Sequence, residues 1–167
     1  VFNSLVTEHP EAGRSQWILG DVYLQTGRVS EGLRAYRAAV SLVGGHYTLL
    51  VEVARRLLGI GRDRAAELLL RYAWEDWPEF PVAPGLLASL YDRQSRFPEA
   101  EAAARGALAG DSTQALQHHI LSRALASQGR LDEARAARLG AIRHGEGDHW
   151  EQWGWLAEIE LGRGDTA

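Results

Sequence analysis

Six histidines are the residues of this 167-residue chain that could most readily bind a metal ion. His118 and His119 are adjacent on a predicted helix, so their side chains point in different directions and cannot both bind one ion unaided. Residues 144–149 gather two histidines, a glutamate and an aspartate, but the glycines between them are sufficiently explained as loop formers. We therefore expect structural or surface roles for the histidines and predict no metal and no cofactor, with a weak ion site at 144–149 as the alternative.

The sequence contains no arrangement typical of catalysis. No Ser/His/Asp set, phosphate-binding glycine loop or isolated carboxylate pair stands out, and the acidic residues are spread along predicted helix faces. Cysteine is absent, which excludes disulfides and thiolate metal sites and leaves the cytoplasm and the periplasm equally open. We predict that the chain is not an enzyme.

The composition describes a folded protein rather than a disordered one. Hydrophobic residues make up 46% of the chain and charged residues 24%. The net charge is -4 although all 18 basic residues are arginine, so we expect no nucleic-acid partner. No apolar run is long enough to span a membrane. Arginine without lysine fits a GC-rich bacterial genome, and a start at Val1 rather than methionine leads us to expect further sequence upstream.

A repeat of 34 residues organises the chain. Four predicted turns recur at this interval, at Gly27-Arg28, Gly61-Arg62, Ser95-Arg96 and Gly129-Arg130. Glycine suits such a turn because it adopts backbone conformations that are costly for other residues. Small residues recur at the same interval before each turn, at Gly20, Ala54, Ala88 and Ser122. We expect two helices to approach closely at each of them.

Apolar residues three and four apart on both sides of each turn predict paired amphipathic helices and no strand. The predicted helices cover residues 14–26, 29–43, 47–59, 63–76, 82–94, 98–109, 115–128 and 132–144. The predicted organisation is a single solenoid with full repeats at 13–46, 47–80, 81–114 and 115–148, preceded at 1–12 by the end of another repeat. Residues 149–167 are expected to be a partial repeat or a cap.

The order of these landmarks resembles that of the tetratricopeptide repeat family. Its pattern W-x2-L-G-x2-Y, then A-x3-F, then P is matched in the first repeat by Leu19, Gly20, Tyr23, Tyr36 and Ala39. Other residues depart from it: Gln16, Leu50, Pro84 and His118 occupy the tryptophan position, and Arg138 occupies the aromatic position of the fourth repeat. The arginine suggests looser packing near the C-terminal end.

The resemblance implies an all-α, right-handed solenoid of antiparallel helix pairs, without catalysis. In this family the concave surface is lined by the first helices and commonly holds a peptide or helix of a partner. The corresponding residues here are Trp17, Asp21, Arg55, Ser89, Arg93, His119 and Arg123. The arginines could pair with ligand carboxylates. The family's clamp for C-terminal carboxylates uses Lys and Asn, and because this chain has no Lys and a single Asn, we expect no such clamp.

Aromatic residues gather at two places in the sequence. Trp74, Trp77 and Phe80 lie at one junction between repeats, and Trp150, Trp153 and Trp155 lie near the C-terminal end. We expect most of these rings to fill gaps between helices. The alternative is that Trp150 or Trp155 is exposed and forms a docking surface for a partner.

These observations favour a non-catalytic scaffold or adaptor that binds a protein or peptide, as a subunit or segment of a larger bacterial assembly. The alternative is a recognition segment of a longer enzyme or envelope export machine whose active part lies elsewhere. A third reading, a periplasmic scaffold for an anionic polymer, requires arginines along one face, and the acidic net charge counts against it.

Overall fold

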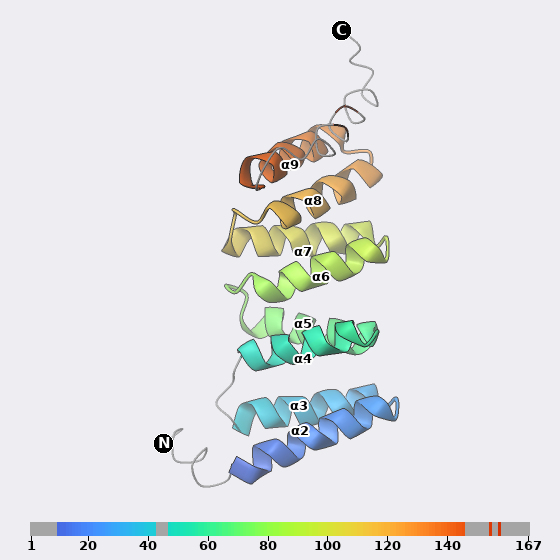
Figure 1. Ribbon diagram of the computed structural model, residues 1–167, viewed down its shortest axis with the longest axis vertical. Coiled ribbons are helices and arrows are strands. Elements are labelled where there is room, and N and C mark those ends of the chain that lie inside the picture. Colours follow the sequence, from blue (N-terminus) through green and yellow to red (C-terminus); the bar gives the residue numbers. More distant parts are fainter. Residues whose placement is uncertain (1–9, 43–46, 146–153, 155–156, 158–167) are drawn as a thin grey trace. The chain divides into compact units, whose positions relative to one another are not determined.

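The structure is a computed structural model that describes residues 10–42, 47–145, 154 and 157. In this part of the chain all regular secondary structure is helical, and the helices run as successive antiparallel pairs (Figure 1). The helices are α2 (Pro10–Gln25), α3 (Val29–Leu42), α4 (Tyr47–Gly59), α5 (Asp63–Asp76), α6 (Val82–Arg93), α7 (Phe97–Gly110), α8 (Ala115–Ser127) and α9 (Leu131–His144). We call α2, α4, α6 and α8 the first helices of their repeats and the other four the second helices.

The predicted helices are confirmed from α3 onward, where every boundary lies within one residue of the prediction. The first helix was predicted to begin at residue 14 and instead begins at Pro10. Proline is tolerated there because the first residues of a helix have no intrahelical partner for their N–H groups. Residues 1–12 were expected to be the end of a preceding repeat, and residues 1–9 of this range lie outside the described residues.

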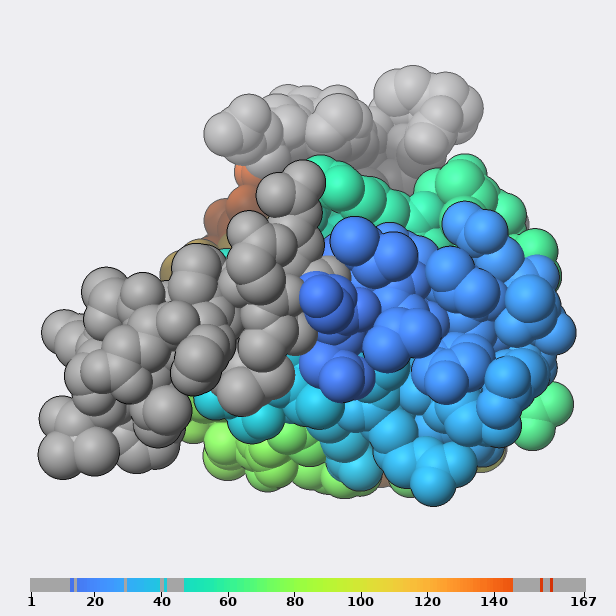
Figure 2. Space-filling view, turned by 90° about the horizontal axis from the view of Figure 1, so that it is seen from below, coloured from blue at the N-terminus to red at the C-terminus, as the bar shows by residue number. Residues whose placement is uncertain are grey.

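The chain divides into two compact units, Val1–Trp77 and Pro78–Ala167, here called unit 1 and unit 2. In unit 1, α2 packs on α3, α4 packs on α5, and α3 also touches α5. Figure 2 shows the part of the unit 1 surface that α2 and α3 form side by side. In unit 2, α6 packs on α7 and α8 on α9, while α8 also contacts both α6 and α7.

Each turn between paired helices has the same hydrogen-bonded form. The glycines have positive φ angles, 77° at Gly27, 72° at Gly61 and 76° at Gly129, and Ser95 has a φ of 57° at the equivalent place. The next residue donates its N–H to a carbonyl five residues earlier, as from Arg28 to Tyr23 at 2.8 Å. This is the Schellman ending of a helix, in which a left-handed residue lets the last carbonyls find donors.

The small residues before each turn lie where paired helices meet, as predicted. A Cβ atom on Gly20 would lie 2.9 Å from the ring of Tyr36, so only glycine fits without moving that ring. Ala54 and Ala88 are fully buried, and buried Ser122 donates its hydroxyl to the carbonyl of Ala134 at 2.7 Å. The pairs are therefore held by close backbone approach, and large apolar side chains fill the space around it. Those fully or almost fully buried are Tyr36, Leu50, Leu69 and Leu70 in unit 1, and Leu87, Leu90, Ile120 and Leu125 in unit 2.

No described helix has the length and apolar character needed to cross a bilayer.

Candidate interaction surfaces

A charged cluster joins the first helices of unit 2. The guanidinium of Arg123 on α8 donates to a carboxylate oxygen of Asp92 on α6 at 3.0 Å. The second carboxylate oxygen of Asp92 is buried and has no hydrogen-bond partner among the residues that the structure describes. An acceptor in this position is costly to leave unpaired, so it can accept a further donor. The prediction placed Arg123 on this surface but did not single out Asp92, 31 residues away.

A buried arginine lies directly behind this cluster. Arg138 on α9 is only 2% exposed, and its guanidinium contacts the Nδ1 atom of His119 on α8. Because a guanidinium can only donate, Nδ1 is the acceptor and the imidazole carries its proton on Nε2. Burial lowers the pKa of His119, and the charges of Arg138 and Arg123 lower it further, against the opposite effect of Asp92. His119 is therefore held in its neutral form.

The four residues of this unit 2 cluster, Asp92, His119, Arg123 and Arg138, carry two positive charges and one negative charge. Burial also lowers the pKa of Arg138, which reflects the cost of removing its charge from water. The excess of positive charge makes the surface formed by α6 and α8 suited to a negatively charged group.

The looser packing suggested by Arg138 is not what the structure has. The guanidinium and its aliphatic stem occupy the position that Tyr36 takes in the first repeat, and α8 and α9 remain closely packed. A Cβ atom on Gly140 of α9 would lie 2.5 Å from the ring of His118 on α8. The prediction failed because a long arginine side chain can fill an aromatic site with its apolar stem and planar head.

In unit 1, two of the predicted surface residues support the core. Trp17 lies against buried Tyr36 with 4.8 Å between the ring centroids, in an edge-to-face arrangement. Asp21 is exposed and accepts a hydrogen bond from the hydroxyl of Tyr36. Burial, followed by this contact with Asp21, raises the pKa of that hydroxyl well above its ordinary value.

The other predicted surface residues have different surroundings. Arg55 on α4 and Arg93 on α6 are exposed. Ser89 donates to the carbonyl of Gly85 in its own helix at 3.1 Å. Trp150 and Trp155 lie outside the described residues, so their docking role remains a prediction.

The two adjacent histidines have separate environments. His118 stacks on His144 with 5.6 Å between ring centroids, and its Nε2 atom lies 2.9 Å from the carbonyl oxygen of Ser112. His119 instead contacts Arg138. In the described part of the chain, no three His, Asp or Glu residues are grouped as metal ligands would be.

Trp77 packs inside unit 1, as expected for a ring that fills a gap. It makes edge-to-face contacts with Tyr47 and Tyr72, at centroid distances of 6.2 and 6.3 Å. Trp74 is half-buried on α5, and Phe80 is 43% exposed.

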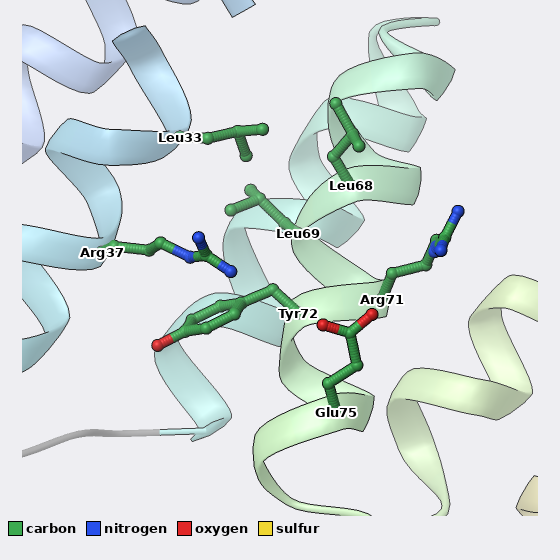
Figure 3. Close-up of a pocket in the computed structure, with 7 residues that line it drawn as sticks. All are labelled: Leu33, Arg37, Leu68, Leu69, Arg71, Tyr72 and Glu75. Carbon is green, nitrogen blue, oxygen red and sulfur yellow. The ribbon is translucent and has the colours of Figure 1, made fainter. Parts of the chain in front are cut away.

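A pocket of about 260 Å³ lies between the second helices of unit 1 (Figure 3). Leu33 and Leu69 face each other across it, and Arg37 reaches from α3 over the ring of Tyr72, 4.0 Å from the ring centroid. The remaining lining comes from α5 and consists of Leu68, Arg71 and Glu75. Burial, and then a hydrogen bond with Asp76, raises the pKa of Tyr72.

The sequence prediction missed this pocket because it considered only the first helices as a binding surface. A sequence signal for it exists. Leu33 and Arg37 are one helical turn apart on α3, and Leu68 and Tyr72 are one turn apart on α5.

Comparison with known proteins supports the interpretation of the repeats. Residues 1–46 match the tetratricopeptide repeat family. A comparison with curated protein sequences gives no match.

Several solved structures share the fold. The first tetratricopeptide repeat domain of Spaghetti (RPAP3), bound to the HSP90 peptide SRMEEVD, is 21% identical, with a TM-score of 0.64 over 71% of this chain and 94% of that one. MamA is 19% identical, with a TM-score of 0.70 over 93% of this chain and 84% of that one. YrrB, described as a tetratricopeptide repeat protein with an unusual peptide-binding site, is 14% identical, with a TM-score of 0.69 over 99% and 85%.

The paired helices, the common turn and these matches define an all-α repeat protein of the solenoid class. The match of residues 1–46 to the tetratricopeptide repeat family and the shared fold of the solved structures agree with the family resemblance and the 34-residue spacing of the sequence.

Proposed function

We propose that this chain is a non-catalytic interaction module that holds an acidic segment of a partner protein on the surface formed by α6 and α8. The observation that carries the proposal is the unit 2 cluster, which contains two arginines and one carboxylate: Arg123 pairs with Asp92, and Arg138 contacts His119. A partner carboxylate would supply the missing negative charge. The module would act as a subunit or segment of a larger bacterial assembly.

The donors for such a carboxylate come from α8. The side chain of Arg123 is 42% exposed while it pairs with Asp92, so part of its planar set of N–H groups faces solvent. His119 is half-buried, and its Nε2–H is a second donor beside it. Arg138 behind His119 raises the local positive potential without contacting the ligand.

The related structures support a peptide as the ligand class. RPAP3 binds an HSP90 peptide, SRMEEVD, that contains three acidic residues. YrrB is described as having an unusual peptide-binding site. The surface formed by α6 and α8 is open and is not closed into a catalytic pocket. An open helical surface suits an extended or helical segment of a partner.

The experiment is co-purification from the native source with a tagged chain, followed by identification of the bound proteins. Arg123→Glu should lose the partner that the unaltered chain retains, because the change reverses the charge at the centre of the surface. Arg143→Glu is the matched control, since Arg143 is exposed on α9 and lies outside the cluster. Equal recovery with Arg123→Glu and with the unaltered chain would contradict the proposal.

A further inference from the structure

We propose that unit 1 has a second docking site on its second helices, the pocket between α3 and α5, and that it takes one large apolar side chain of an acidic partner segment. This site is separate from the α6–α8 surface and does not depend on the function proposed for it. It is built from residues of unit 1 alone.

The size of the pocket points to a side chain rather than to a free small molecule. Its volume of about 260 Å³ is below the range of about 300 to 1,000 Å³ typical of small-molecule sites. Its walls are mainly apolar: Leu69 is fully buried, and Leu33 and Leu68 are half-buried at the opening. One aliphatic or aromatic side chain would remove these leucines from water, as an anchor residue does in a protein interface.

The charge at the rim selects an acidic segment. Arg37 and Arg71 line the opening with Glu75, so the rim has one more positive than negative charge. The face of the Arg37 guanidinium lies on the ring of Tyr72, and stacking of this kind leaves the N–H edge of a guanidinium available to a carboxylate. Within the described part of the chain, neither arginine forms an ion pair. An acidic residue beside the apolar anchor would therefore meet two guanidinium groups against the single rim carboxylate of Glu75.

The equivalent place in unit 2 shows what a closed junction of this kind contains. Two repeats after Leu33 and Arg37 stand Glu101 and Arg105, and two repeats after Leu69 and Tyr72 stand Ala137 and Gly140. Glu101 is buried and bonds Arg105 and Arg130, and Arg105 also bonds Glu133 at 3.2 Å. Ion pairs thus occupy the junction in unit 2 where unit 1 has an open apolar pocket.

The test is a titration of ¹⁵N-labelled full chain with the acetylated and amidated peptide Gly-Ser-Asp-Leu-Asp-Ser-Gly, followed by amide chemical shifts. Saturable shifts should centre on α3 and α5. Replacing the central Leu of the peptide by Ser should weaken binding about tenfold or more, because burial of one leucine accounts for most of the affinity. Replacing both Asp residues of the peptide by Arg should weaken binding several-fold.

Two variants of the chain complete the test. Leu33→Glu places at the pocket the residue type found at the equivalent position in unit 2, and it should abolish the shifts while circular dichroism shows an unchanged helix content. Leu116→Glu is the control with the same charge change, at an exposed position of α8, and should bind as the unaltered chain does. Arg123→Glu should also leave this binding unchanged, so failure here and failure of the α6–α8 surface are distinguishable.

Three results would overturn the inference: no shifts at millimolar peptide, shifts confined to α6 and α8, or equal binding by Leu33→Glu. A dimer in sedimentation experiments that Leu33→Glu dissociates would also overturn it, because a second copy of the chain would then be the occupant.

Discussion

The junctions between second helices differ in the two units, although they occupy equivalent positions in the repeats. In unit 1, α3 and α5 meet around an apolar pocket, with Arg37 stacked on Tyr72. In unit 2, buried Glu101 is bonded by Arg105, by Arg130 at 2.6 Å and by Gln128 at 2.8 Å. The repeat therefore determines that two helices meet, and the side chains at the meeting point determine whether the junction is closed or open to a partner.

The first prediction concerns the cores of the two units and has the largest expected effect. Leu87→Ala in unit 2 should lower the free energy of unfolding by about 3 to 5 kcal/mol, because it leaves a new cavity around a fully buried site. Leu69→Ala in unit 1 should cost less, about 2 to 3 kcal/mol, because Leu69 already lines a pocket. Urea unfolding followed by circular dichroism measures both values.

Leu116→Ala serves as the control for these two variants, since Leu116 is 58% exposed on α8 and should change stability little. A larger loss for Leu69→Ala than for Leu87→Ala would contradict the expectation that a residue beside an existing pocket leaves the smaller new cavity.

The second prediction removes the buried charge of unit 2. Arg138→Phe restores an aromatic residue at the position of Tyr36 and should raise the free energy of unfolding by about 1 to 2 kcal/mol, since a buried guanidinium is costly to desolvate. It should also weaken binding of an acidic partner to α6 and α8. Thermal unfolding measures the first effect. A lowered melting temperature would show that the contact between Arg138 and His119 stabilises the fold by more than the burial of the guanidinium destabilises it.

The third prediction concerns acid sensitivity. The folded-state pKa of His119 is lowered by burial, Arg138 and Arg123, so the unfolded chain binds this proton more readily. The stability due to neutral His119 is fully present above its unfolded pKa of about 6.5 and is lost as the pH falls through that value toward the folded pKa. A single group of this kind changes the free energy of unfolding by at most about 1.4 kcal/mol per pH unit.

Urea unfolding between about pH 7.5 and about pH 5.5 tests this dependence. His119→Gln should flatten it, and Arg138→Phe should reduce it by removing a cation that faces the imidazole. The histidines that the structure describes all lie in unit 2, so amide hydrogen exchange should show earlier acid opening in α8 and α9 than in α4 and α5. An equal pH dependence of the free energy of unfolding in His119→Gln and in the unaltered chain would rule out His119 as the origin of the acid sensitivity.

The fourth prediction has the smallest effect and compares two turns. Ser95→Gly should raise the free energy of unfolding by about 0.5 to 1 kcal/mol, because Ser95 has a φ of 57° that glycine adopts without strain. Gly61→Ala should lower it by about 1 kcal/mol through the same conformational cost, since nothing lies within 4 Å of the added Cβ atom. Changes of the same sign in the two variants would contradict this explanation.

Much of the fold could be predicted from the 34-residue pattern. The turns at Gly27, Gly61 and Gly129 and the close approach at Gly20 follow from the conformational freedom and small size of glycine. The start of α2 was placed four residues late, at residue 14, because proline usually interrupts a helix, whereas Pro10 is the first residue of this one.

The candidate sites were predicted only in part. His119 and Arg123 were expected on a first-helix surface, but their partners Arg138 and Asp92 were not anticipated. The partners are 19 and 31 residues away in the sequence, so each contact depends on the side-chain rotamers of residues on two different helices. The expectation of loose packing at Arg138 was wrong for the same reason, since the side chain is buried within the pair of α8 and α9.

Helix positions, turn conformations and the sites of close helix approach follow from the amino-acid sequence, because each depends on residues that are neighbours along one repeat. The charge excess between α6, α8 and α9 and the pocket between α3 and α5 arise only when separate helices are packed. Side chains at equivalent repeat positions then meet different partners, as Leu33 and Glu101 do. Packing between repeats thus turns one repeated pattern into two junctions of different chemistry.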